Sequence, residues 1–266
     1  MPIIHDDEHA TVVWGDWRET LAVAAERGGV DALIVDAPYS ERTHAGHDDG
    51  AEIANAATIA APSVRGNARR QSMGLRAVRR EMQYPSWSAA DVAAFVAETS
   101  SAVRGWRVSI TDHVLGPAWA ASYEAAGLYA FRVVPCVIAG MTVRFVGDGP
   151  SSESVFVQVA RPATQAFARW GTLPGYYSGA REKQSWVGGK PLWLMLALVR
   201  DYSRRGDVVC DPCAGGFTTG RAARMLGRRF IGGDIDRKAA EEGVRVMKAT
   251  REQIAMPWGE RDAASK

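Results

Sequence analysis

The sequence contains few of the features that mark a membrane protein or a disulfide-rich secreted protein. Its longest uninterrupted apolar run, Leu192–Val199, is too short to span a bilayer. The stretch His5–His9 is acidic and lacks the basic and then apolar pattern of a secretion signal. Three cysteines in 266 residues fit a reducing cytosol better than a disulfide framework. These absences predict a cytoplasmic protein that is long enough to bury one full core.

Metal-ligand patterns are also scarce. Cys210 and Cys213 have the spacing of a zinc-ligand pair, but a structural zinc site needs four ligands. Cys136 is the only other thiol in the chain. We therefore expect two half-buried thiols and no metal site.

The net charge is only +2, but its distribution along the chain is uneven. Residues 1–60 are acidic, whereas residues 63–83 are rich in arginine and contain one acid, Glu81. Such a block indicates either a phosphate-contacting face or a solvated segment. Arginine suits contacts to phosphates and to base edges alike. The arginines of this block are Arg65, Arg69, Arg70, Arg76, Arg79 and Arg80.

Strand-like and helix-like segments alternate along the chain, which predicts an α/β fold with a doubly wound, mostly parallel sheet. Expected strands include residues 12–14, 32–35, 106–112, 131–138, 154–159, 208–211 and 229–234. Expected helices follow the Gly-Asp at 15–16, begin near an N-cap at Ser88, and run from Lys190-Pro191 to about Tyr202. We expect one domain over residues 1–255, with excursions at about 41–86 and 161–188 and a flexible tail at 256–266.

A glycine-rich motif lies late in the chain. Residues 206–219, Gly-Asp-Val-Val-Cys-Asp-Pro-Cys-Ala-Gly-Gly-Phe-Thr-Thr, predict a strand, a tight turn and the start of a helix. Glycines at such a turn let the backbone approach a ligand and aim free amides at it. The next expected strand ends at Asp234, where an acid suits the two hydroxyls of a ribose. The pattern predicts an adenosine-containing cofactor, and taken alone it also suits a dinucleotide.

A second motif lies early, where the strand at 32–35 runs into Asp36-Ala37-Pro38-Tyr39. A carboxylate and the carbonyl of residue 37 can accept the N–H groups of an exocyclic base amine, which frees its lone pair for attack. Pro38 stiffens the turn, and Tyr39 offers a ring on which an extruded base stacks. An ordinary Asp-x-Pro turn at the end of a strand is the alternative for the tetrad alone.

Both motifs resemble those of a known family. Residues 211–219 are similar to the Asp-Pro-Phe-Ala-Gly-Ser-Gly-Thr-Thr motif of S-adenosylmethionine-dependent DNA amino-methyltransferases, and residues 36–39 resemble their Asp-Pro-Pro-Tyr tetrad. Because the tetrad precedes the glycine motif, the chain resembles the circularly permuted beta class, which methylates adenine N6 or cytosine N4. The resemblance implies a Rossmann-like methyltransferase fold, S-adenosylmethionine as cofactor and double-stranded DNA as substrate.

The resemblance also implies roles for individual residues. It places catalysis at Asp36, Ala37, Pro38 and Tyr39. It implies a cofactor site formed by Lys190, Asp211, Pro212, Cys213, Ala214, Gly215, Gly216, Phe217, Thr218 and Asp234. DNA contacts are expected at Ser40, His44, Arg65, Arg69, Arg70, Arg76, Arg79 and Arg80, although His44 is equally consistent with a surface loop histidine.

Three positions depart from the family pattern. Ala37 replaces a proline and leaves the tetrad backbone less constrained, so we expect a slower or more adaptable site. Cys213 replaces the usual phenylalanine, and Phe217 stands where the last glycine is expected. The ring of Phe217 is expected to clash with the edge of the cofactor or to stack on it.

Several functions remain open at this point. Methylation of adenine N6 is the leading hypothesis, and methylation of cytosine N4 is the alternative within the class. A DNA-binding regulator on a catalytically degenerate methyltransferase fold is suggested by Ala37 and Phe217, and RNA methylation is disfavoured by the motif order. The chain contains no endonuclease-like region, so any restriction endonuclease would be a separate chain. The aromatic stretch 170–186 is a candidate homodimer interface.

Overall fold

The computed structural model describes residues 3–44, 84–140, 154–164, 170–182, 186 and 189–253. Its strands form one ten-stranded sheet with the order β1-β2-β10-β9-β3-β4-β7-β6-β8, and β5 pairs with β7 outside this path. The strands are β1 Ile3–Asp6, β2 Ala10–Trp14, β3 Val30–Asp36, β4 Val103–Thr111, β5 Leu128–Ala130, β6 Val134–Ala139, β7 Ser154–Pro162, β8 Tyr177–Ala180, β9 Val208–Asp211 and β10 Arg229–Asp234.

The centre of the sheet is parallel, and antiparallel pairs lie toward both of its edges. Strands β2, β10, β9, β3 and β4 run in the same direction, whereas β7 is antiparallel to both β4 and β6. This arrangement confirms the expected α/β class with a mostly parallel sheet. The expected strand at 131–138 begins later, at Val134, because β5 and β6 pair with different halves of β7. The circular permutation stays a prediction from the motif order.

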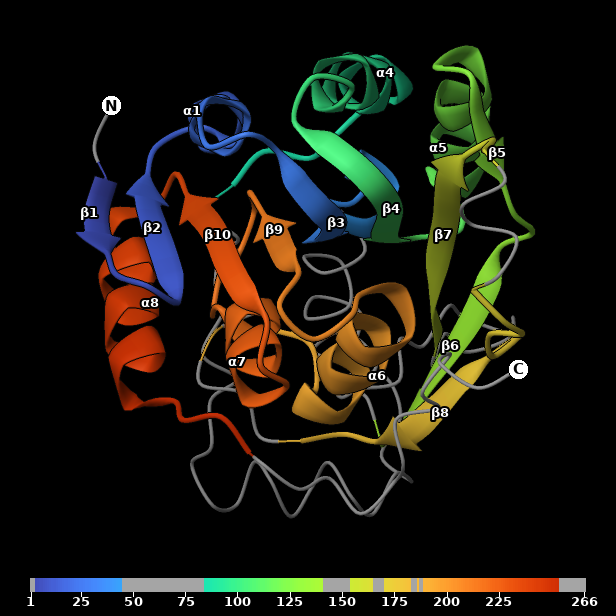
Figure 1. Ribbon diagram of the computed structural model, residues 1–266. Helices are drawn as coiled ribbons and strands as arrows, with labels where there is room; N and C mark the ends of the chain where they lie inside the picture. The colour runs from blue at the N-terminus through green and yellow to red at the C-terminus, as the bar shows by residue number, and fades with distance from the viewer. Residues whose placement is uncertain are drawn as a thin grey trace, which may run out of the picture.

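Helices cover both faces of the sheet (Figure 1). Helices α1 Trp17–Glu26, α4 Ala89–Thr99 and α5 Gly116–Ala125 lie on one face, and α6 Leu192–Tyr202, α7 Thr218–Met225 and α8 Arg237–Ala249 lie on the other. Alternate residues of β3 therefore enter different cores, with Leu33 packing on the α1 side and Ile34 on the α6 side. Burial on both faces explains the nearly continuous apolar sequence of this strand.

Local signals set the start of the helices near the site. Ser88 caps α4 as expected, because its hydroxyl accepts the Asp91 amide while the Asp91 carboxylate accepts the Ser88 amide in return. Asp16 and Glu19 form the same reciprocal cap on α1. Helix α6 follows Pro191, which confirms the helix expected from Lys190-Pro191 to Tyr202. The residues that begin α1, α4 and α6 are thereby fixed by local signals in the sequence.

None of the helices that the structure describes combines the length and apolar character needed to cross a membrane. Within the same residues, no group of three or more His, Cys, Asp or Glu side chains is placed to hold a metal ion. Cys136 and Cys210 are fully buried, and Cys213 is only partly buried. The two thiols of the Cys210/Cys213 pair thus differ in exposure, whereas the sequence suggested that both are half-buried.

Candidate active site

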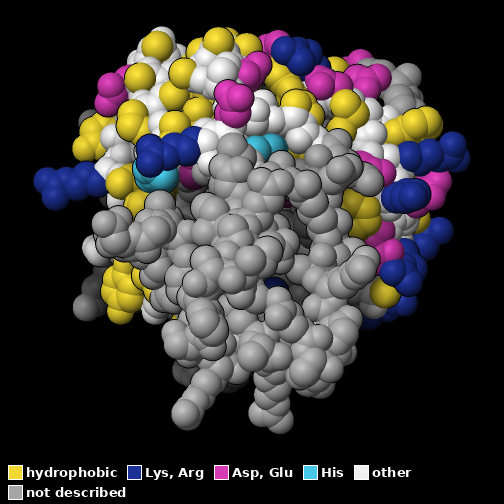
Figure 2. Space-filling view, turned by 180° about the vertical axis from the view of Figure 1, so that it is seen from behind, with side chains coloured by type: hydrophobic (Ala, Val, Ile, Leu, Met, Phe, Trp, Pro, Cys, Tyr) yellow, Lys and Arg dark blue, Asp and Glu magenta, His cyan; other side chains and the backbone are white. Residues whose placement is uncertain are grey.

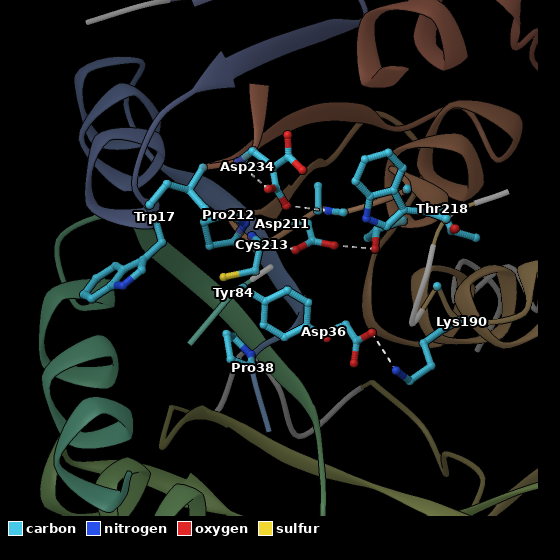
Figure 3. A pocket seen from close by; sticks show the side chains of 18 of the residues that line it. Trp17, Asp36, Pro38, Tyr84, Lys190, Asp211, Pro212, Cys213, Thr218 and Asp234 are labelled. Atoms are coloured by element: carbon cyan, nitrogen blue, oxygen red, sulfur yellow. Dashed lines mark hydrogen bonds and ion pairs between the residues drawn. The ribbon is translucent and has the colours of Figure 1, made fainter. Parts of the chain in front are cut away.

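A cavity of about 920 Å³ opens at the carboxyl ends of the central parallel strands. Three carboxylates enter it from three strand ends, with Asp36 on β3, Asp211 on β9 and Asp234 on β10. Ligands of doubly wound sheets bind at this edge, and the volume lies within the usual range for a small-molecule site. The two motifs, more than 170 residues apart in the chain, therefore share one cavity (Figure 3).

Two residues of the tetrad form part of the wall of this cavity, and Tyr39 is not among the lining residues. Asp36 and Pro38 line it, whereas Ala37 is buried among the residues that pack against α1 and α4. The Tyr39 hydroxyl donates to Asp36 Oδ1 at 3.3 Å, and burial, followed by the charge of Asp36, raises the pKa of Tyr39 well above its usual value. Tyr39 is thus kept as a neutral phenol that donates to the carboxylate.

Lys190 reaches the tetrad from the segment before α6. Its Nζ donates to Asp36 Oδ2 at 2.6 Å and lies 4.9 Å from the centroid of the Tyr39 ring. The pair is largely shielded from solvent, with Lys190 12% and Asp36 22% exposed. The sequence placed Lys190 at the cofactor, and the structure shows it on the cavity wall in contact with the tetrad (Figure 3).

The turn after the tetrad is anchored beneath the sheet edge. Ser40 is buried, and both its amide and its hydroxyl donate to Asp112 Oδ2, which also accepts the hydroxyl of Thr43. Burial alone would raise the pKa of Asp112, but these hydrogen bonds outweigh it and lower the pKa. The structure thus gives the Ser40 side chain an internal contact, where the sequence suggested a contact to DNA.

The glycine turn is fixed to the end of β10. The Gly215 amide donates to Asp234 Oδ2 at 2.8 Å, and the Asp236 amide donates to Asp234 Oδ1 at 2.8 Å. Burial raises the pKa of Asp234. Gly215 has a positive φ of 49°, and a Cβ built on Gly216 would lie 2.8 Å from the Cβ of Trp186. Both glycines are therefore needed, one for its backbone conformation and one for the close approach of Trp186.

Asp211 lies at the base of the same turn. It accepts the Thr219 hydroxyl at 2.5 Å and the Cys213 amide at 3.2 Å. Burial raises the pKa of Asp211 to about 7, and these two hydrogen bonds only partly oppose the shift. The remaining residues of the turn on the cavity wall are Pro212, Cys213, Ala214 and Thr218.

Phe217 corrects one expectation from the sequence. Its backbone is left-handed, with φ 56°, and its side chain is fully buried. The ring lies against Gly243 of α8 and 6.2 Å from the Phe230 ring, and the residue does not line the cavity. The ring therefore does not enter the cavity, because the turn directs it into the core between α7, α8 and β10.

Several residues that line the cavity were not predicted from the sequence. Tyr84 lies beside Asp36 in the cavity lining, and its pKa is raised to about 12, mainly by burial and then by the charge of Asp36 (Figure 3). The His44 ring lies edge-on to Tyr84, at 5.5 Å between centroids. Asp16 and Ile235 line the opposite end. The signal for Asp16 was the Gly-Asp that directly follows β2, because an acid after a parallel strand lies at the same edge of the sheet as Asp234.

The remaining expected DNA contacts lie outside the described residues. They are Arg65, Arg69, Arg70, Arg76, Arg79 and Arg80. The excursion at 41–86 is described only at 41–44 and 84–86, and the excursion at 161–188 is described only in part. A role of these segments in DNA recognition stays a prediction.

Comparisons with known proteins identify the family of this chain. A model of the DNA methylase family of N6/N4 methyltransferases matches residues 82–245. DNA adenine methyltransferase YhdJ of Escherichia coli strain K12 is 43% identical over 56 residues. That match covers 21% of this chain and 19% of YhdJ, so the chain matches about a fifth of the length of this curated relative.

Solved structures show the same fold at low sequence identity. The complex of M1.HpyAVI with SAM superposes with a TM-score of 0.59 at 17% identity, covering 89% of this chain and 98% of that one. The cytosine-N4-specific PvuII DNA methyltransferase superposes with a TM-score of 0.60 at 10% identity, covering 97% of this chain and 91% of that one. At these identities the likeness establishes the fold and no more.

Proposed function

This chain belongs to the DNA methylase family of N6/N4 methyltransferases, and we propose that it transfers a methyl group from S-adenosylmethionine to the N6 amino group of a flipped adenine in double-stranded DNA. One observation carries the proposal. The carboxylate of the tetrad and the glycine turn with its strand-end acid open into one cavity, so an amine held by Asp36 would meet a cofactor held at Asp234.

The glycine-turn side of the cavity suits an adenosine-containing cofactor. Asp234 stands at a strand end, where its carboxylate can accept the ribose hydroxyls. Ile235 is 61% exposed at the same end of the cavity, and together with Pro212 it offers apolar surface to the adenine ring. When bound, S-adenosylmethionine would supply a methyl group on a positively charged sulfur.

The tetrad side suits an exocyclic amine. Asp36 and the carbonyl of Ala37 would accept its two N–H groups, which favours a pyramidal nitrogen with an available lone pair. That lone pair would be free to attack the methyl group that a bound cofactor would supply, with the electrons of the carbon–sulfur bond left on sulfur. The nitrogen then sheds one proton, for which the Asp36 carboxylate is the adjacent acceptor. Base extrusion is needed because the amine is out of reach inside the duplex.

The choice of adenine is supported by the partial match to YhdJ, which is a DNA adenine methyltransferase. Cytosine N4 is the second candidate, because a cytosine-N4-specific enzyme shares the fold. Both bases present the same exocyclic amine to Asp36, so the mechanism above applies to either.

Nucleoside mass spectrometry on DNA from a methylation-free host that expresses this protein tests the proposal. We expect N6-methyladenine with the wild type and none with Asp36→Ala, while Asp36→Ala retains cofactor binding in calorimetry. Glu124→Ala, which removes an exposed carboxylate from α5, serves as the control and should leave the mark unchanged. If the DNA contained N4-methylcytosine instead, the target base would be cytosine and not adenine.

Two results would contradict the activity itself. If soluble wild type left neither mark, failed to bind S-adenosylmethionine and still bound DNA, the chain would be a DNA-binding regulator on a degenerate fold. A mark that persists at full level in Asp36→Ala would remove the tetrad from the mechanism.

A further inference from the structure

Both oxygens of the Asp36 carboxylate already have partners. Oδ2 accepts Lys190 Nζ at 2.6 Å, and Oδ1 accepts the Tyr39 hydroxyl at 3.3 Å. The same ammonium lies 4.9 Å from the centroid of the Tyr39 ring. Lys190 therefore makes the two contacts that the proposed reaction requires of the target base, an N–H donor on the carboxylate and a partner on the aromatic face.

A base amine cannot take this position while Lys190 holds it. The ammonium is charged and the base amine is neutral, so the ammonium is the stronger donor to a carboxylate. The pair is also shielded, since the two side chains are 12% and 22% exposed, and water weakens it less than an ion pair on the surface. A base whose amine takes this position on Asp36 and whose ring takes the face of Tyr39 therefore has to displace Lys190.

A bound cofactor would offer the Lys190 ammonium a second carboxylate partner within the same cavity. It lines the wall together with Gly189, Trp186 and Thr218, and Trp186 packs on the glycine turn. S-adenosylmethionine carries one carboxylate, at its amino-acid end, and a positive sulfur beside the methyl group. The four-carbon stem of a lysine is flexible enough to exchange one carboxylate for another. A positive sulfur next to Asp36 would further disfavour an ammonium at that position.

We propose that Lys190 closes the base site until the cofactor is bound, and that the cofactor carboxylate takes the ammonium from Asp36 and so opens the site to the base. This inference rests on the proposed function and adds an order to it, with the cofactor binding before the base is extruded. Lys190 is then a positioning residue that acts through Asp36, and it prevents a base from being held in a cavity that contains no methyl donor.

Cofactor calorimetry tests the second partner of Lys190 without DNA. S-adenosylhomocysteine has the amino-acid end, and methylthioadenosine lacks it. Lys190→Met keeps the length of the side chain and removes its charge, so it should weaken S-adenosylhomocysteine binding about ten- to hundredfold, as for a lost charge-assisted hydrogen bond. Methylthioadenosine binding should stay unchanged. An equal effect on both ligands, or on neither, would overturn the exchange. Lys248→Met, on the exposed end of α8, is the control.

Base extrusion tests the closure itself. The probe is a duplex with 2-aminopurine at the adenine that the wild type methylates, since the fluorescence of this base rises when it leaves the stack. Wild type should raise the fluorescence only with S-adenosylhomocysteine, whereas Lys190→Met should raise it without any cofactor. A wild type that extrudes the base alone, or a Lys190→Met protein that still needs the cofactor, would overturn the closure while leaving methylation intact. Absence of methylation would instead contradict the proposed function, and calorimetry would still decide the exchange.

Discussion

Asp211 is a carboxyl group whose charge state near neutral pH depends on the fold. Burial raises its pKa to about 7 from an ordinary value of 3.8. The folded protein therefore keeps the proton to higher pH than the unfolded chain does. The resulting stability is complete below about pH 4 and is lost as the pH rises through 7. The wild-type protein should lose free energy of unfolding between pH 5 and pH 8 as Asp211 ionises. In Asp211→Asn we expect this loss to be smaller by on the order of 2–3 kcal/mol, measured by urea unfolding at each pH.

Asp112 provides the matched control for this experiment. Burial raises its pKa, but the hydrogen bonds from Ser40 and Thr43 outweigh that effect, so its pKa is lowered in the folded state. Its contribution to stability is present above about pH 4 and is lost only in more acidic solution. Asp112→Asn should therefore keep the wild-type slope between pH 5 and pH 8. If Asp211→Asn kept that slope as well, Asp211 would not be the titrating group.

At the scale of the elements, Phe217 joins α7 to α8. Its ring is fully buried, and a Cβ built on Gly243 would lie 2.5 Å from it. Phe217→Ala should cost about 3–5 kcal/mol through the cavity it leaves. Gly243→Ala should cost about 1–3 kcal/mol through overpacking. In the double variant the new methyl group occupies vacated space, so the combined cost should fall below the sum by about 1–2 kcal/mol in urea unfolding.

A glycine with open surroundings shows whether this coupling is local. Among the residues that the structure describes, and leaving aside its two chain neighbours, no atom lies within 4 Å of a Cβ built on Gly175. Combined with Phe217→Ala, the substitution Gly175→Ala should therefore be additive within about 0.5 kcal/mol. Additivity in the Phe217/Gly243 pair too would mean that α8 moves away from the ring when Gly243 is replaced.

At the scale of the whole molecule, the sequence predicted the sheet class and both motif strands, and these together imply that the two strand ends meet at one edge of the sheet. It could do so because parallel strands end at the same edge, so that strand-end residues converge whatever their separation in the chain. It did not predict the direction of the Phe217 ring, which depends on a left-handed backbone angle. Nor did it predict the ion pair between Lys190 and Asp36, because no periodic pattern links side chains 154 positions apart.

The distribution of charge over the molecule gives the last prediction. In the described part of the face shown in Figure 2, Lys and Arg side chains lie among acidic ones, whereas residues 63–83 combine several arginines with one acid. If that segment contacts phosphates, Arg69→Gln with Arg70→Gln should weaken DNA binding. The slope of the logarithm of the binding constant against the logarithm of the salt concentration should become less steep by about 2. The reason is that binding releases fewer counterions when two phosphate contacts are missing.

A second double variant separates the placement of charge from its amount. Arg237→Gln with Arg245→Gln removes two positive charges as well, but from exposed positions on α8, where both arginines pair with glutamates. The net charge of the two double variants is identical, so a long-range field would change DNA binding equally in both. A change of slope confined to the Arg69/Arg70 variant, measured by fluorescence anisotropy from low to physiological salt, would place the phosphate contacts in residues 63–83. An equal change of the salt slope in both variants would place the phosphate contacts elsewhere on the molecule.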